Sequence, residues 1–278
     1  MKDYTKTLPN HIEQYIGEND LFLEIFEGDD SPETTAKRPP LLFVHGAYSG
    51  SWMWSKYIPH FVSNGWKCYV MNLRSHYKSR VLDLTKVSFD DYLEDIKEVV
   101  KVIIAEGGEA PLLIGHSMSG ILGQKLAETV VLAGLIPLDS SISKEVYDIA
   151  PFQERSEITT GIILPAPPRE ERVSMDESEE DIIFQRKYLT MESFKAISEF
   201  AFFFGAEKGI SIDSSMITCP GLVICAVNST ADDIRGKATA EQLHAEYAGF
   251  PGTTHTGLLV GQRYLEVVDK ILDWLKRF

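Results

Sequence analysis

Small residues surround a serine where a strand-like run turns into a helix-like run. The segment 110–128 reads APLLIGHSMSGILGQKLAE, with Gly115, Ser119 and Gly120 around Ser117. A tight strand-to-helix turn strains the backbone at such a serine and projects its hydroxyl above a sheet, and small neighbours avoid clashes there. Ser119 stands where the G-x-S-x-G pattern has glycine, but serine is small enough to fit. The segment predicts that Ser117 is a nucleophile; the alternative is an ordinary strand-to-helix turn.

A serine hydroxyl needs a base that takes its proton, and that base needs a carboxylate that fixes its tautomer. His255 lies in FPGTTHTGLLVG, a Gly-rich loop between the last predicted strand and the C-terminal helix. We therefore expect His255 to be the general base. His76 is expected in a polar loop without a part in the chemistry, and no histidine spacing typical of a metal site occurs.

Three aspartates are candidates for the acid. Counting forward from the strand CPGLVICAV places it near Ser229, whereas counting back from a predicted helix QLHAEY selects Asp232, and a small insertion would reconcile the two. We rank Asp232 first, Asp139 at the end of LIPLD second and Asp233 third. Asp139 is a candidate because a carboxylate on the neighbouring strand can also reach the imidazole. The aspartates that are not the acid would be turn or helix-cap residues.

The developing oxyanion of acyl transfer needs hydrogen-bond donors, which backbone amides can supply. One candidate is the amide of Met118, directly after the nucleophile. The other is the amide of Ala47, in the loop that follows LLFVHG.

Composition excludes several classes of protein. The chain has 278 residues, 44% of them hydrophobic, and a net charge of -14, which disfavours a nucleic-acid partner because such a partner requires a basic face. The three cysteines form no C-x-x-C pair, and no apolar run reaches the roughly 18 residues of a membrane span. We expect a cytoplasmic protein that has no cofactor, no metal and no membrane span.

Strand and helix patterns alternate along most of the chain, which favours a largely parallel sheet with helices on both faces. An opening hairpin is predicted from HIEQYIG and LFLEIFEG, followed by a buried strand in LLFVHGA. Further strands are predicted at 67–72, 111–115, 133–138 and 221–227, and helices at 52–64, 89–105, 120–128 and 264–278.

The alternation stops near Ser141 for about 75 residues, too many for a structureless loop in a compact domain. Helical patterns at 182–189 and 194–204 predict that this segment is an inserted lid, which divides the chain into a core of 1–140, a lid of 141–215 and a second core part of 216–278. Ala201–Phe204 could face a ligand or pack the lid against the sheet.

These motifs resemble the α/β-hydrolase superfamily over nearly the whole chain. FVHGAYSGSWMW is similar to the plant methylesterase and hydroxynitrile lyase branch, and NLRSHYKS resembles a degraded D-x-R-G-x-G-x-S loop of bacterial esterases. The resemblance implies an α/β-hydrolase fold with a mostly parallel sheet of eight strands, a helical lid after strand six, and a triad in the order Ser, Asp, His.

The resulting hypothesis is a serine hydrolase of the carboxylesterase type, acting on a small, apolar ester substrate through an acyl-enzyme on Ser117. Two alternatives remain open: a non-hydrolytic or C–C bond-cleaving enzyme on the same scaffold, because fold does not fix the reaction, and a ligand-binding protein whose triad is idle. The sequence predicts no oligomeric state.

Overall fold

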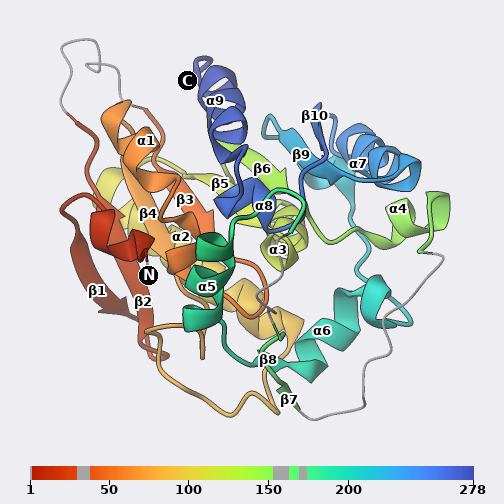
Figure 1. Cartoon of the computed structure of the whole chain (residues 1–278), viewed down its shortest axis with the longest axis horizontal. Helices are drawn as coiled ribbons and strands as arrows, with labels where there is room; N and C mark the ends of the chain where they lie inside the picture. Colours follow the sequence, from red (N-terminus) through yellow and green to blue (C-terminus); the bar gives the residue numbers. More distant parts are fainter. Residues whose placement is uncertain (1, 30–37, 153–162, 169–173) are drawn as a thin grey trace.

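The computed structural model describes residues 2–29, 38–152, 163–168 and 174–278. Its centre is an eight-stranded sheet in the order β1-β2-β4-β3-β5-β6-β9-β10 (Figure 1). β2 pairs antiparallel with β1 and with β4, and all other neighbours pair parallel. The strands are β1 Ile12–Ile16, β2 Leu21–Phe26, β3 Leu41–Val44, β4 Cys68–Met71, β5 Leu112–His116, β6 Gly134–Leu138, β9 Leu222–Val227 and β10 Glu246–Pro251. The predicted hairpin and the predicted mostly parallel sheet are confirmed.

The described helices are α1 Ile58–Ser63, α2 Phe89–Gly107, α3 Met118–Ala127, α4 Lys144–Ile149, α5 Glu179–Tyr188, α6 Phe194–Phe200, α7 Thr230–Gln242, α8 Gly257–Val260 and α9 Tyr264–Leu275. Ser88 caps α2 by accepting a hydrogen bond from the amide of Asp91. The helix predicted over 52–64 is wrong in part, because a 3-10 turn at Ser51–Trp54 precedes α1. Proline at position 59 lacks the amide proton that a continuous helix would use, so α1 starts afresh there.

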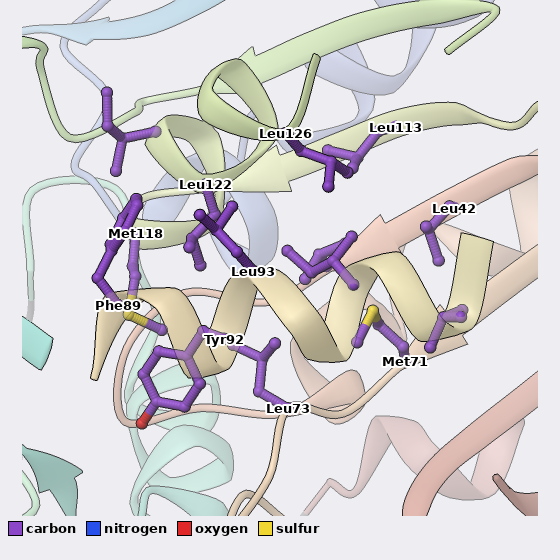
Figure 2. Close-up of a cluster of buried hydrophobic side chains, with 14 of the residues drawn as sticks. Leu42, Met71, Leu73, Phe89, Tyr92, Leu93, Leu113, Met118, Leu122 and Leu126 are labelled. Atoms are coloured by element: carbon purple, nitrogen blue, oxygen red, sulfur yellow. The ribbon is translucent and has the colours of Figure 1, made fainter. Parts of the chain in front are cut away.

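The hydrophobic core lies on both faces of the sheet. Along β3, Leu42 and Val44 belong to one buried cluster and Leu41 and Phe43 to the other, as the two-residue period of a strand requires. Figure 2 shows the first cluster, in which side chains of α2 and α3 meet those of the strands. The second contains the apolar side chains of α1 and α9. Two packed layers thus hold the carboxyl ends of the strands in fixed positions.

The chain between β6 and β9 has structure of its own. It contains α4, α5 and α6, and a two-stranded sheet in which β7 (Ile163–Leu164) pairs with β8 (Glu192–Ser193). In Figure 1 the green and teal segments α5, α6 and β8 lie together below the central sheet. Helices α5 and α6 coincide with the two predicted helical patterns, although α6 ends at Phe200.

Helix α5 is bonded to the rest of the molecule by a buried carboxylate. Asp181 accepts hydrogen bonds from the Tyr4 hydroxyl at 2.7 Å and from the Lys56 ammonium at 2.6 Å.

Among the helices that the structure describes, none has the length and apolar character of a membrane span.

Candidate active site

Ser117 occupies a strained turn between β5 and α3. Its φ of 55° and ψ of -117° lie where residues other than glycine are rarely found. Three backbone hydrogen bonds of 3.0 Å keep it there: the Ser117 amide donates to the Leu138 carbonyl, and the Ser117 carbonyl accepts from the amides of Gly120 and Ser141. The turn is thereby joined to the end of β6, the neighbouring strand.

Close packing around this turn explains its small residues. A Cβ on Gly115 would lie 2.3 Å from the Ser119 carbonyl oxygen, and one on Gly46 would lie 2.9 Å from the Ser117 Cβ. Ser119 is fully buried, and its hydroxyl donates to the carbonyl of His45. The serine that replaces the usual glycine therefore fits and gains a partner.

His255 is held by Asp139. The Asp139 Oδ2 lies 2.5 Å from the His255 Nδ1, and Oδ1 accepts a hydrogen bond from the Ala226 amide at 3.0 Å. Asp139 directly follows β6, at a φ of 45°. The His255 ring packs on the ring of His116, the residue before Ser117, with centroids 4.5 Å apart. The contact with Asp139 engages Nδ1 and leaves Nε2 as the other ring nitrogen of His255.

The acid ranked first from the sequence is engaged elsewhere. Asp232 lies in the first turn of α7, accepts from the Asn228 amide at 3.2 Å and pairs with Arg235 at 2.7 Å. Asp233 pairs with Lys237 and accepts from the Tyr247 hydroxyl. The count back from a helix at QLHAEY went wrong because α7 runs from Thr230 to Gln242 and Tyr247 already belongs to β10.

Ser117, His255 and Asp139 all line one cavity of about 580 Å³. Ala47 and Met118, whose amides are the predicted oxyanion donors, line it too. Met118 is the first residue of α3, so its amide has no acceptor within the helix and lies at the positive end of the helix dipole. The five residues are thus gathered at a single site.

Much of the cavity wall is aromatic and comes from the chain between β6 and β9. All of Ala201–Phe204 line the cavity, together with Phe200 and Phe152. Phe202 stacks on Tyr147 with centroids 4.0 Å apart. Ala201 packs in the buried cluster that contains strand residues of the sheet, as one of the two alternatives predicts, and the ligand-facing alternative stays a prediction.

The same part of the chain holds the loop that carries His255. Asp176, which is 3% exposed, accepts from the Thr254 amide at 2.8 Å and from its hydroxyl at 2.7 Å. Glu177 accepts from the Thr256 hydroxyl at 2.8 Å. Buried carboxylates therefore fix the residues on both sides of His255.

A buried pair of a histidine and an acid was missed from the sequence. His76, expected in a polar loop, is fully buried, and its Nε2 lies 3.0 Å from an oxygen of Glu192, also fully buried. The neighbouring carboxylate raises the pKa of His76 against the opposing effect of burial. His45 has the opposite shift: burial and the nearby His76 lower its pKa to about 3. The only sequence signal was the Arg-Ser-His loop itself.

One group with metal-ligand chemistry lies elsewhere in the described residues. The ligand atoms of His11, Glu13 and Glu24, at the β1–β2 edge of the sheet, lie within 4.8 Å of one another. Lys78 already pairs with Glu13 at 2.7 Å, and the His11 ring stacks on Phe26. This edge is separated from β5 and Ser117 by β4 and β3 in the order of the sheet.

The chain matches the family described as the alpha/beta hydrolase family over residues 41–270. No curated protein matches the sequence significantly. Among solved structures, a soluble variant of monoglyceride lipase from Saccharomyces cerevisiae is 16% identical, with a TM-score of 0.69 over 99% of this chain and 97% of that one.

Two further solved structures are similarly related. A carboxylesterase of Nitrososphaera gargenis is 15% identical, with a TM-score of 0.66 over 96% of this chain and 99% of that one. A monoacylglycerol lipase of Paleococcus ferrophilus is 18% identical, with a TM-score of 0.63 over 92% and 98%. At these identities the three structures support the fold alone.

Proposed function

Because the chain belongs to the alpha/beta hydrolase family, we propose that it is a serine hydrolase that cleaves a small, apolar carboxylic ester through an acyl-enzyme on Ser117. The observation that carries the proposal is the contact between His255 and Asp139 at the cavity that Ser117 also lines. A nucleophile, a base and an acid that orients the base are what acyl transfer requires.

In the proposed reaction the Ser117 Oγ attacks the ester carbonyl carbon while the His255 Nε2 takes the hydroxyl proton. The amides of Ala47 and Met118 stabilise the negative charge on the carbonyl oxygen by donating hydrogen bonds to it. Collapse of the tetrahedral species expels the alcohol, which receives the proton from His255. Water then repeats the sequence on the acyl-enzyme, which releases the acid and restores Ser117.

Asp139 is proposed as the acid in place of Asp232. Its contact with Nδ1 holds the proton on that nitrogen, so that Nε2 is free to accept. It also stabilises the imidazolium that forms in each half-reaction. Ala226 fixes the carboxylate from the other side.

The cavity supports the proposed substrate class. Its volume of about 580 Å³ falls in the range of small-molecule sites, and apolar groups form most of its lining. We propose that residues 141–215 act as a lid that supplies the aromatic wall, so that the acyl or alkyl group of the ester packs against Phe200 and Phe202–Phe204.

The test is hydrolysis of p-nitrophenyl butyrate by Ser117→Ala. Loss of the nucleophile should lower kcat on the order of a million-fold, to the detection limit. The matched control is Ser63→Ala, an exposed serine of α1 that donates only to the carbonyl of its own helix turn. Full activity of the Ser117 variant would refute the proposal.

Two further measurements separate the alternatives. Rapid labelling of the wild type, and not of Ser117→Ala, by a fluorophosphonate would exclude an idle triad, because only an activated serine reacts. Product analysis must show one acid and one alcohol per ester consumed. Products of C–C cleavage or of addition would instead indicate a different reaction on this scaffold.

A further inference from the structure

A fully buried carboxylate from the proposed lid reaches the loop of Ala47. Glu192 lies in β8, 144 residues from Tyr48 in the chain, and accepts a hydrogen bond from the Tyr48 amide at 3.2 Å. The Tyr48 carbonyl accepts from the Thr190 amide at 2.9 Å. Thr190 and Glu192, two residues of one short segment, thus bind the carbonyl and the amide of Tyr48.

The two oxygens of Glu192 have different tasks. Oε1 accepts from the Tyr92 hydroxyl at 2.5 Å and from the Ser193 amide at 2.7 Å, so it fastens β8 to α2. Oε2 accepts from the Tyr48 amide and contacts Nε2 of His76 at 3.0 Å. Only the second oxygen therefore acts on the Ala47 loop.

Glu192 is ionised at neutral pH although it is buried. Burial raises the pKa of Glu192, but the His76 charge and the hydrogen bonds from His76, Tyr92 and Ser193 outweigh burial and leave that pKa below its usual value. A carboxylate in this setting makes stronger hydrogen bonds than a neutral acceptor. The bond to the Tyr48 amide is a charge-assisted one.

Tyr48 needs such support. Its φ of 64° lies in the left-handed region, which is strained for a residue other than glycine. The peptide group that joins Ala47 to Tyr48 is planar, so the bond from the Tyr48 amide to Glu192 also fixes the carbonyl of Ala47. The same planar unit contains the Cα of Ala47, to which the Ala47 amide nitrogen is bonded, so Glu192 acts on that amide by fixing the position of this Cα.

We propose that Glu192 is a positioning residue for the oxyanion: it holds Tyr48 in its left-handed conformation and so aims the Ala47 amide at the reacting carbonyl. The inference rests on the proposed function, and it makes the segment between β6 and β9 part of the catalytic apparatus as well as a wall of the cavity. The chemistry itself stays with Ser117, His255 and Asp139.

The experiment compares Glu192→Gln with Tyr92→Phe. A glutamine keeps the shape of Glu192 but removes its negative charge, so the bond from the Tyr48 amide loses its charge assistance even when the side-chain carbonyl still faces Tyr48. Tyr92→Phe removes a donor to Oε1 of the same carboxylate without a change at Oε2. Glu192→Asp, which keeps the charge but withdraws it by one methylene, replaces the glutamine variant if that variant does not fold.

Loss of one oxyanion donor costs about 100- to 1,000-fold in kcat. For a misaimed donor we expect kcat of Glu192→Gln to fall about 10- to 100-fold while KM stays within about threefold. The inhibition constant of a trifluoromethyl ketone, whose adduct carries an oxyanion, should rise by the same factor as kcat falls. Tyr92→Phe should lower the melting temperature but leave kcat within about threefold.

The inference is overturned if folded Glu192→Gln or Glu192→Asp keeps kcat within twofold of the wild type, or if kcat falls without a parallel change in the ketone's affinity. Loss of kcat in Tyr92→Phe as large as in Glu192→Gln would also overturn it, because the effect would then follow the stability of β8. Failure of the proposed function looks different: the wild type itself would lack activity that depends on Ser117.

Discussion

Exchange of Asp139 for asparagine tests the assignment of the acid most directly. The Oδ1 of Asp139 accepts from the Ala226 amide at 3.0 Å, and its Oδ2 faces the His255 Nδ1 at 2.5 Å. In Asp139→Asn the side-chain carbonyl must face Ala226, because an amide nitrogen cannot accept a hydrogen bond. Its NH₂ group then faces Nδ1, which must become the acceptor.

The consequence is the wrong tautomer of His255. The ring proton moves to Nε2, which can no longer take the proton of Ser117. The same exchange in a Ser-His-Asp protease lowers kcat about 10,000-fold, which corresponds to roughly 5 kcal/mol of transition-state stabilisation. We expect a loss of that order in kcat for p-nitrophenyl butyrate, with the melting temperature little changed.

Asp232→Asn is the matched control. It removes a charge from a partly exposed pair with Arg235, and such pairs contribute about 1 kcal/mol or less. We expect kcat within about threefold of the wild type. Activity of Asp139→Asn within tenfold of the wild type, or an equal loss in Asp232→Asn, would refute the reasoning.

Two further predictions concern the backbone and the pH. Gly46→Ala places a Cβ 2.9 Å from the Cβ of Ser117. This variant should lower kcat at least tenfold while the melting temperature falls by only a few degrees. An unchanged kcat in a steady-state assay would contradict the close approach of the two residues. Neutral His45 accepts from the Leu73 amide through Nε2, and its pKa is lowered to about 3, so the unfolded chain binds the additional proton below pH 6.5. Through this group alone, the free energy of unfolding in urea should therefore fall by roughly 1 kcal/mol per pH unit on acidification from pH 6 to pH 4. In His45→Gln the free energy of unfolding should depend less on pH. Equal pH dependence in both proteins would show that His45 is not responsible.

The turn at Ser117 could be predicted because its signal is local. Strand, small residues and helix follow one another within 19 residues, and each is recognisable from its own pattern. The family match and the sheet confirm the fold that this pattern indicates. The same holds for the two helices α5 and α6, whose apolar spacing survives in an otherwise irregular segment.

The acid could only be ranked, because the decision is not local. Asp139 and Asp232 follow two adjacent parallel strands, β6 and β9, and both line the cavity. What separates them is the backbone: Asp139 has a φ of 45° at the strand end, whereas Asp232 lies in the first turn of a helix that starts two residues earlier, at Thr230. Neither feature has a distinctive sequence signature.

The Glu192 network lay beyond sequence reasoning for a related reason. His76 and Glu192 are 116 residues apart, and neither of the short stretches around them indicates a buried ion pair. Burial of both charges depends on how the chain between β6 and β9 docks against α2. A single sequence contains no pattern that reports such a pairing.

The place of Asp139 on β6 has a consequence for the rest of the cavity rim. In the proposed reaction the imidazole is oriented from that strand, so Asp232 and Arg235 border the cavity without a role in proton transfer. Exchange of these two side chains can therefore change the size or charge of one end of the cavity while the contact between Asp139 and His255 stays as it is. Substitutions at that end of the cavity can thus change the substrate preference without a change in the catalytic residues.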